Sequence, residues 1–153
     1  MTIRFATTED MPAIHDLVQE LALFEKAPEQ VETTAEIYAA DFSANQPAFH
    51  CLVAEHETDG IVGIALFYFG YSTWKGRLLY LDDLVIRESH RRQGIGSQLM
   101  EALLAHAKEK QVRQMRWQVL DWNDPAIQMY QKMGAKIEGE WMNCSLSYQQ
   151  LNP

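Results

Sequence analysis

A glycine-containing turn between a strand-like and a helical segment constrains the fold of this chain more than any other feature. Residues 91–96 read Arg-Arg-Gln-Gly-Ile-Gly, and a largely apolar, strand-like segment, residues 77–86, precedes them. Behind the turn, Leu99, Leu103 and Ala107 recur every four residues, which predicts an amphipathic helix. Glycines let the backbone turn tightly, and the helix directs free N–H groups and its positive end at an anion. The sequence therefore predicts a strand–turn–helix unit that binds a phosphate group.

Two common nucleotide-binding turns do not match this segment. A P-loop ends in Gly-Lys-Ser/Thr, and a dinucleotide-binding turn carries a third glycine, whereas Gln98 and Leu99 follow here. Two glycines alone also suit an ordinary turn that caps a helix. The turn by itself thus predicts an anion site without identifying the ligand.

Alternating apolar residues and turn signals predict a strand-rich chain. An antiparallel hairpin is expected in the middle, because Thr58-Asp59-Gly60 separates two strand-like runs. Strands are expected at residues 3–6, 49–55, 61–71, 77–86 and 115–119, with one or two more within 136–148.

Four helices are expected between these strands. The spacing of apolar residues predicts them at residues 14–24 and 37–42, after Gly96, and between Asp124 and Gly134. Asp124 is expected to cap the last helix and Gly134 to end it. The order β-α-α-β-β-β-α-β-α-β predicts an α/β protein of the α+β type. Its mixed central sheet should have six to seven strands with helices on both faces, in a single domain over 1–153.

The composition favours a cytoplasmic protein. Thirteen basic residues against 21 acidic ones give a net charge of −8, which disfavours nucleic acid and anionic membranes as partners. The N-terminus lacks a signal-like apolar stretch, and the longest apolar run is too short to cross a bilayer. Cys51 and Cys144 are too few for a disulfide framework, and no histidine pair has metal-ligand spacing with a third ligand nearby. No metal is expected.

The turn and its context resemble the acyl-CoA signature of the GNAT superfamily of N-acetyltransferases. That signature is Arg/Gln-x-x-Gly-x-Gly/Ala after a strand, and residues 91–96 fit it at every fixed position. Within the superfamily the chain most closely resembles the spermidine/spermine (diamine) and thialysine N-acetyltransferases. The segments that carry this resemblance are FHCLVAE at 49–55, LLYLDD at 78–83, VLDWN at 119–123, YQKMGA at 130–135, and Glu25 with Glu29-Gln30-Val31.

The resemblance implies the GNAT fold and an acetyl-CoA co-substrate, whose acetyl group moves to a primary amine of a small cationic acceptor by direct attack. In this fold the fourth strand splays from the fifth, so its backbone can pair with the pantetheine arm. The residues implied at the cofactor are Leu84, Val85 and Ile86; the turn residues Arg91, Arg92, Gln93, Gly94, Ile95, Gly96 and Ser97; and Asn123, Asp124, Pro125, Ala126, Tyr130 and Lys132.

Two side chains are the catalytic candidates. Tyr130 matches the catalytic tyrosine of the family, and its phenol can protonate the departing thiolate, although a lone tyrosine on a helix usually packs. Asp82 is the candidate base, where the family normally carries Glu. Because Asp is one methylene shorter, a water can bridge, or Asp83 can take the role. Two adjacent carboxylates in a strand also occur at capped turns and beside arginines.

The acceptor site is expected to be acidic and partly aromatic. A diamine needs negative charge at two separated points, and aromatic rings can cover its methylene chain or ammonium. Arg116 suits an acceptor that carries a carboxylate, such as thialysine, better than a polycation. The residues expected here are Phe24, Glu25, Glu29, Trp74, Asp82, Asp83, Arg116 and Gln118.

Other functions remain compatible with the same cofactor half. A GNAT enzyme acting on a protein N-terminus, a lysine side chain or an antibiotic amine would differ only in the acceptor half. A non-catalytic acyl-CoA-binding regulatory domain would not need both Asp82 and Tyr130. Family resemblance further implies a homodimer with shared C-terminal strands.

Overall fold

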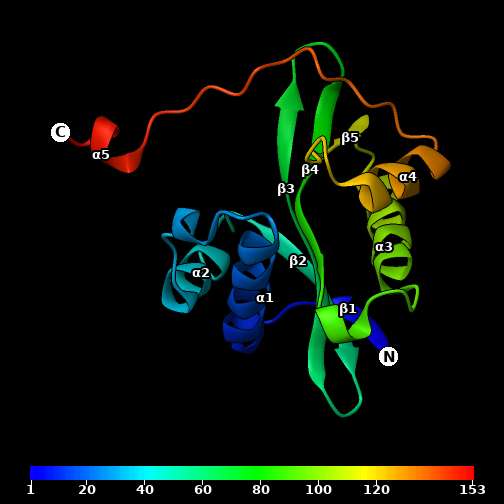
Figure 1. Cartoon of the computed structure of the whole chain (residues 1–153). Coiled ribbons are helices and arrows are strands. Elements are labelled where there is room, and N and C mark those ends of the chain that lie inside the picture. Colours follow the sequence, from blue (N-terminus) through cyan, green and yellow to red (C-terminus); the bar gives the residue numbers. More distant parts are fainter. The chain divides into compact units, whose positions relative to one another are not determined.

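A five-stranded sheet lies at the centre of the fold (Figure 1). Neighbouring strands pair antiparallel except the last pair, which is parallel, so the sheet is mixed as expected. The strands follow each other across the sheet in chain order: β1 (Thr2–Phe5), β2 (His50–His56), β3 (Gly60–Ser72), β4 (Gly76–Ile86) and β5 (Gln114–Arg116).

The structure, a computed structural model, describes all residues from 1 to 153. Tertiary contacts group these residues into two units, Met1–Trp117 and Gln118–Pro153, and each unit is described by itself. The first unit holds the whole sheet and three of the helices. The second holds two helices joined by a segment without regular structure.

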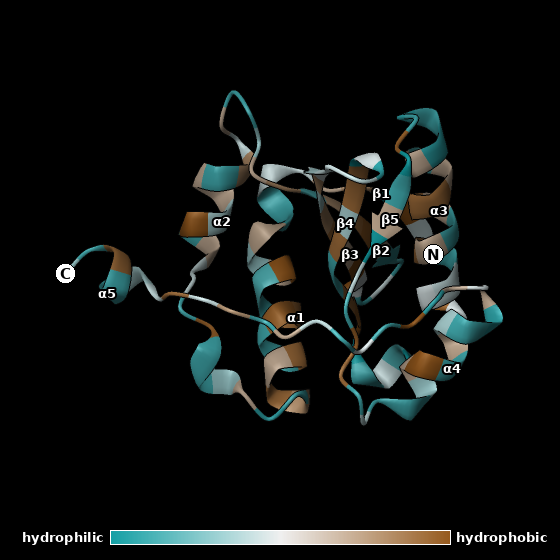
Figure 2. Ribbon diagram, turned by 90° about the horizontal axis from the view of Figure 1, so that it is seen from above, coloured by the Kyte–Doolittle hydropathy of each residue, from teal (hydrophilic) through white to brown (hydrophobic).

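The helices of the first unit cover both faces of the sheet, which confirms that expectation. They are α1 (Met11–Phe24), α2 (Ala35–Phe42) and α3 (Ile95–Glu109). In Figure 2, α1 and α2 lie on one side of the strands and α3 lies on the other. Short 3₁₀ turns, η1 (Thr8–Asp10), η2 (Pro28–Gln30) and η3 (Glu88–His90), join the elements.

Alternation along the strands explains this two-sided packing. On β2, Cys51 and Val53 join the core cluster that includes Ile14 and Leu17 of α1. On the opposite face, α3 packs so closely over β3 that a Cβ at Gly63 would lie 3.2 Å from Leu99. Burying each such aliphatic side chain contributes about 1.5–3 kcal/mol, so the apolar pattern of the strands and helices accounts for both layers.

A network of charges fixes the corner where β1 meets α1. Arg4 donates two hydrogen bonds to the carboxylate of Asp10, at 2.8 and 3.0 Å, and its Nε donates to Glu55 at 2.8 Å. Asp10 also accepts from the backbone N–H of Thr7 at 2.8 Å. The Arg4 hydrogen bonds hold the pKa of Asp10 below its usual value, so this carboxylate is a satisfied structural anion.

The expected number of strands is wrong: the sheet has five strands, not six to seven. Residues 135–147 form no strand and lead into the short helix α5 (Tyr148–Leu151). A strand is stable only where a neighbouring backbone supplies hydrogen bonds, and the second unit contains no other strand. The fifth strand is also shorter than expected, because it ends at Arg116.

The longer helix of the second unit is α4 (Asp124–Lys132), and its ends lie within one residue of those predicted from the sequence. Asn123 rather than Asp124 occupies the cap position, and a proline lies in the first turn as expected. Gly134 ends the helix with a φ of +87°, a conformation that glycine adopts without strain. No helix in either unit has the length and apolar character needed to span a bilayer.

Candidate functional site

The middle of β4 has a free edge on the side of β5. Only Leu78, Leu79 and Tyr80 pair with β5, whereas the strand continues to Ile86. On the other side β4 stays paired with β3 as far as Ile86, opposite Gly63. No strand therefore takes up the backbone groups of residues 81–86 on the β5 side, and apart from the Ile86 oxygen, which accepts from Arg91, they form a row of donors and acceptors for an extended ligand.

A β-bulge in the pairing of β4 with β3 lies just after the point where β4 separates from β5. Leu81 pairs with Phe67 and Asp83 pairs with Leu66, so Asp82 has no partner in the register. Bulges bend a strand, increase its twist and redirect a side chain, and they are common near active sites. The bulge explains both the divergence of β4 from β5 and the exposure of Asp82, which lies between two better buried neighbours.

Three carboxylates near the bulge lack ion pairs. The pKa of Asp83 is raised to about 7, mainly by burial and to a smaller extent by the charges of Asp82 and Glu25. Asp82 is exposed, but the protein around it still displaces enough water to raise its pKa, and burial also raises the pKa of Glu25. The structure thus brings together three of the predicted acceptor residues, and one of them titrates near neutral pH.

The glycine turn has the geometry of an anion site. Gly94 is the N-cap of α3 with a φ of +79°, and no side chain caps the helix. The first N–H groups of α3 are consequently available to a ligand. A Cβ at Gly94 would meet nothing within 4 Å, so its positive φ, rather than crowding, is what favours glycine there.

The two arginines of the turn have different surroundings. Arg91 Nε donates to the backbone oxygen of Ile86 at 3.1 Å, and its guanidinium lies 5.3 Å above the ring of Phe24. Arg92 is exposed, with a backbone φ of +63°. The sequence predicted both arginines at a phosphate and Phe24 at the acceptor. The structure adds a contact between Arg91 and Phe24, one residue from each predicted set.

The remaining predicted cofactor residues lie at the start and along the length of α4, in the second unit. Asn123 precedes the helix, and residues 124–126 form its first turn, while Lys132 is exposed at its last. Tyr130 is the one buried side chain of this unit, with 8% of its surface exposed. Burial raises the pKa of Tyr130, so the phenol stays protonated at neutral pH.

The other predicted acceptor residues have more polar or more exposed surroundings. Glu29 lies exposed in η2, and Trp74, at the turn between β3 and β4, is 85% exposed. Gln118, in the second unit, donates to Asn143 at 3.0 Å. Arg116 lies close enough to Tyr80 for its charge to lower the pKa of that phenol, against the larger raising effect of burial.

Sequence reasoning missed an aromatic pair beside the carboxylates. Tyr68 and Tyr80 face each other across β3 and β4, with ring centroids 5.2 Å apart and nearly parallel planes. The charge of Asp82 adds to the effect of burial in raising the pKa of both phenols. Pairing the expected hairpin of residues 61–71 and 77–86 in register would have revealed this pair.

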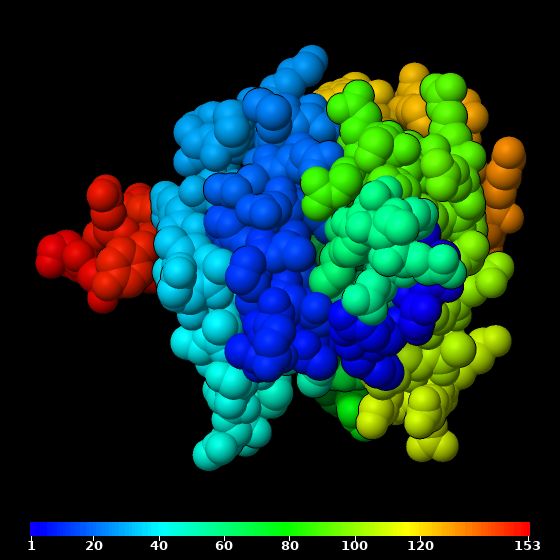
Figure 3. Space-filling view, turned by 90° about the horizontal axis from the view of Figure 1, so that it is seen from below, coloured from blue at the N-terminus to red at the C-terminus, as the bar shows by residue number.

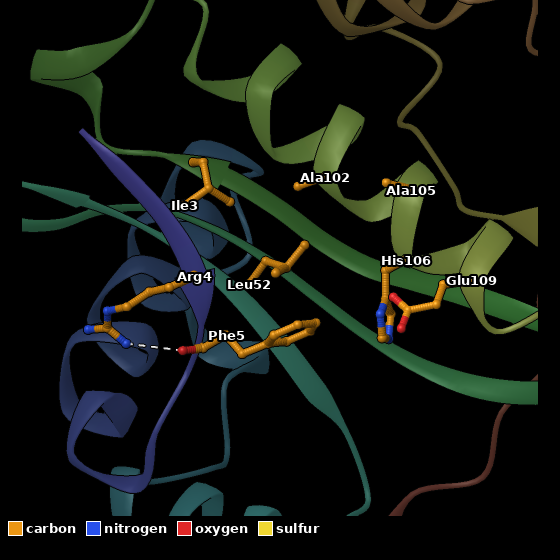
Figure 4. Close-up of a pocket in the computed structure, with 8 residues that line it drawn as sticks. All are labelled: Ile3, Arg4, Phe5, Leu52, Ala102, Ala105, His106 and Glu109. Atoms are coloured by element: carbon orange, nitrogen blue, oxygen red, sulfur yellow. Dashed lines mark hydrogen bonds between the residues drawn. The ribbon is translucent and has the colours of Figure 1, made fainter.

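A pocket of about 320 Å³ lies elsewhere in the first unit (Figure 4). It is formed by β1, β2 and α3, near the edge of the sheet opposite β5. It contains none of the predicted site residues. The lining residues are Ile3, Arg4, Phe5, Leu52, Ala102, Ala105, His106 and Glu109.

The structure also gathers two histidines with a carboxylate, which the spacing of the histidines did not predict. One ligand atom each of His56, Asp59 and His90 lies within 4.8 Å of the others. His90 is 31 residues from Asp59 in the chain, so only the packing of η3 against the β2–β3 turn brings them together.

Comparison with known proteins identifies the family of the chain. Residues 12–135 match the acetyltransferase (GNAT) family, so the chain belongs to this family and is an N-acetyltransferase that uses acetyl-CoA. It is 41% identical over 151 residues to a thialysine N-epsilon-acetyltransferase of Bos taurus, a match covering 93% of this chain and 89% of that protein. An L-ornithine N5-acetyltransferase of Arabidopsis thaliana is 28% identical over 190 residues, covering 95% and 83%.

Solved structures confirm the fold class. An aminoglycoside acetyltransferase from a soil metagenomic sample superposes with a TM-score of 0.78 at 22% identity, covering 95% of this chain and 96% of that one. The BH1408 protein of Bacillus halodurans superposes with a TM-score of 0.74 at 24% identity, covering 95% and 100%. These likenesses concern the fold alone.

Proposed function

We propose that the acceptor of this N-acetyltransferase is a small cationic amine of the diamine, polyamine or thialysine type. The observation that carries the proposal is the cluster of Glu25, Asp82 and Asp83, which lacks basic partners at the bulge of β4. Unpaired carboxylates attract an ammonium group and are costly to keep unless they bind one. The relatives named for thialysine and ornithine acetylation support the same acceptor class.

The donor half follows from the open edge of β4. Leu84, Val85 and Ile86 offer backbone groups to the pantetheine amides, as a neighbouring strand would. The turn and first helical residues from Arg92 to Ser97 would hold the pyrophosphate, with Arg92 as the free cation and Arg91 in a supporting role. A backbone N–H near Leu84 polarises the thioester carbonyl. The family resemblance implies cofactor roles for residues 123–126, Tyr130 and Lys132 as well, all of which belong to the second unit.

Asp83 is the proposed general base, and Asp82 is proposed to attract the ammonium. A base that works near neutral pH needs a pKa close to 7, which burial and neighbouring charges give Asp83. Asp82 is exposed at the bulge and shorter than the glutamate of the resembled family, so it suits long-range attraction better than proton transfer. The deprotonated amine then attacks the acetyl carbon, and the thioester bond breaks as the C–N bond forms.

Tyr130 is the proposed acid for the departing thiolate. Its buried phenol is protonated at neutral pH and can donate that proton. In Tyr130→Phe we expect kcat to fall by about 10²–10³-fold while the affinity for acetyl-CoA stays within about twofold, because only the proton donor is lost. Single-turnover thiol release and acetyl-CoA titration measure the two quantities, and an unchanged kcat would remove Tyr130 from this role.

A thiol-release assay with acetyl-CoA tests the acceptor class. The panel contains putrescine, spermidine, spermine, ornithine, lysine, thialysine, an aminoglycoside and a peptide with a free N-terminus. We expect the highest kcat/KM for a small diamine or thialysine. Arg116 at the neighbouring strand favours thialysine over spermine, because it pairs with a carboxylate and repels a polycation. A preference for the peptide or the aminoglycoside would refute the proposed acceptor.

We also propose that the chain acts in the cytoplasm as a homodimer, with both units of each chain forming one acetyltransferase domain. The family match spans both units. The extended segment before α5 carries exposed apolar side chains, with Trp141 78% and Met142 91% exposed, which suit burial against a second copy. Light scattering should give twice the chain mass, and deletion of residues 136–153 should give a monomer.

A further inference from the structure

Two segments of the first unit that are far apart in the chain meet at the turn between β2 and β3. His56 ends β2, Asp59 lies in the turn to β3, and His90 ends η3 after β4. Figure 3 shows the turn and the segment after β4 side by side. The three ligand atoms lie within 4.8 Å of one another.

His90 is oriented by a second hydrogen bond. Its Nδ1 lies 2.9 Å from Ser89 Oγ, and its Nε2 lies 2.9 Å from Asp59 Oδ2. The ring can carry its proton on either nitrogen. With the proton on Nδ1, directed at Ser89, the Nε2 lone pair lies beside Asp59 Oδ2 and can bind a cation together with it; with the proton on Nε2, the same contact is a plain hydrogen bond. A hydroxyl or carbonyl on the outer ring nitrogen is also the usual companion of a metal-binding histidine.

His56 places an acceptor nitrogen near the same carboxylate. The backbone N–H groups of Thr58 and Asp59 each point to its Nδ1 at 3.3 Å, so this nitrogen acts as an acceptor. Asp59 Oδ2 lies 3.6 Å from the same Nδ1. The other carboxylate oxygen, Asp59 Oδ1, accepts from Thr58 Oγ1 at 3.1 Å, which leaves Oδ2 facing the two histidines.

We propose that His56 Nδ1, Asp59 Oδ2 and His90 Nε2 bind one divalent transition-metal ion of the zinc type. Two imidazole nitrogens, one carboxylate oxygen and a water make an ordinary tetrahedral set. Bonds of about 2.0–2.2 Å in that geometry separate ligand atoms by roughly 3.3–3.6 Å. The observed 2.9 Å is shorter than this separation, 3.6 Å lies at its upper end, and all three ligand atoms lie within 4.8 Å, so binding requires rotation of these side chains.

Binding would join the β2–β3 turn to the segment that runs directly into the glycine turn. His90 is followed at once by Arg91, so the ion would restrain the start of the proposed pyrophosphate loop. Only this consequence depends on the proposed function. Metal binding itself is measured on the protein without acetyl-CoA.

The test uses the full chain with Cys144→Ser, because this exposed thiol could bind metal on its own. Titration with Co²⁺, followed by its visible absorption, and displacement by Zn²⁺ report both geometry and stoichiometry. We expect one ion per chain. His56→Gln and Asp59→Asn should each lower Zn²⁺ affinity at least about tenfold. The matched control His106→Gln, which changes a histidine on α3 outside the cluster, should leave it unchanged.

Thermal unfolding gives a second readout that does not depend on activity. Zn²⁺ should raise the Tm of the Cys144→Ser protein and of His106→Gln but not that of the two site variants. Asp59 is half exposed, so Asp59→Asn should fold even if a change at the less exposed His56 does not. Absence of binding, or binding unaffected by both substitutions, would overturn the proposal and leave a plain hydrogen bond between His90 and Asp59.

Discussion

The corner where β1 meets α1 and the middle of β4 both hold carboxylates, but in opposite electrostatic surroundings. Asp10 accepts hydrogen bonds from Arg4 and from a backbone N–H, so its pKa lies below the ordinary value. Asp83 is largely buried without a basic partner and lies near two other acids, so its pKa rises to about 7. A carboxylate that is fully satisfied contributes to stability, whereas an unsatisfied one is available for proton transfer and cation binding.

The largest expected effect is on activity, and it should follow substitution of Asp83 but not of Asp10. In Asp83→Asn we expect kcat to fall by about 10²–10⁴-fold, because the amide cannot accept the proton of the amine. In the parent, kcat/KM should rise with pH through about 7 as Asp83 ionises. Steady-state kinetics from pH 5.5 to 9 measure both. A parent-like profile in the variant would transfer the role of base to Asp82 or to water.

The second expected effect is on stability, and it should follow substitution of Asp10. Asp10→Ala removes both hydrogen bonds to Arg4 and leaves that guanidinium less satisfied, which should cost about 2–3 kcal/mol of unfolding free energy. The kcat per folded molecule should not change. Urea unfolding and active-site-normalised kinetics test the two halves of this prediction, and an activity loss with parental stability would contradict the comparison.

A third effect concerns how stability depends on pH. The folded pKa of Asp83, about 7, lies above the ordinary value of about 3.9, so between these values the folded state binds more protons. Stability from this group is therefore present at low pH and lost as the pH rises through 7. Asp83→Asn should accordingly be more stable than the parent at pH 8, by about 1–2 kcal/mol, and closer to it at pH 5.

Asp10 should behave in the opposite sense. Its folded pKa is lowered, so its contribution is present above the ordinary value and is lost only as the pH falls through the folded pKa. Asp10→Ala should therefore be less stable than the parent at both pH 5 and pH 8. A stability deficit that disappears at pH 5 would show that the two carboxylates are not as different as their surroundings indicate.

The smallest effect is expected at the exposed carboxylate of the bulge. Asp82→Asn should raise KM for a cationic acceptor by about three- to tenfold and leave kcat within about threefold, because the lost charge attracts the ammonium without taking its proton. Measurements at low and high salt sharpen the result, since screening should shrink the difference. A large fall in kcat instead would make Asp82 the base.

Much of the fold could be predicted from the sequence because its signals are local. Alternation in residues 49–86 gave three adjoining strands close to their observed bounds, and the glycine turn gave the start of α3. The C-terminal strands failed for a non-local reason. An apolar extended segment reads as a strand, but pairing requires a second backbone, and the unit that holds residues 136–148 has none.

The candidate site also has features that the sequence predicted and features that depend on tertiary packing. The adjacent pair Asp82 and Asp83 and the turn at residues 91–96 were visible in the chain, and resemblance to the GNAT family supplied their proposed roles. The different surroundings of the two acids were not visible. They depend on a one-residue bulge in the pairing with β3 and on the approach of Glu25 from the end of α1.

The sequence by itself determined the order of the elements up to α4 and the position of the glycine turn, and its resemblance to the GNAT family gave the acetyltransferase class. The elements and the turn follow from residues that are neighbours along the chain, whose periodicity and conformational preferences act over a few positions. Only the tertiary structure decided which carboxylate titrates near 7, which arginine is left for an anion, and that His56, Asp59 and His90 meet. Burial and charge act through space, so they appear only when distant segments are packed together.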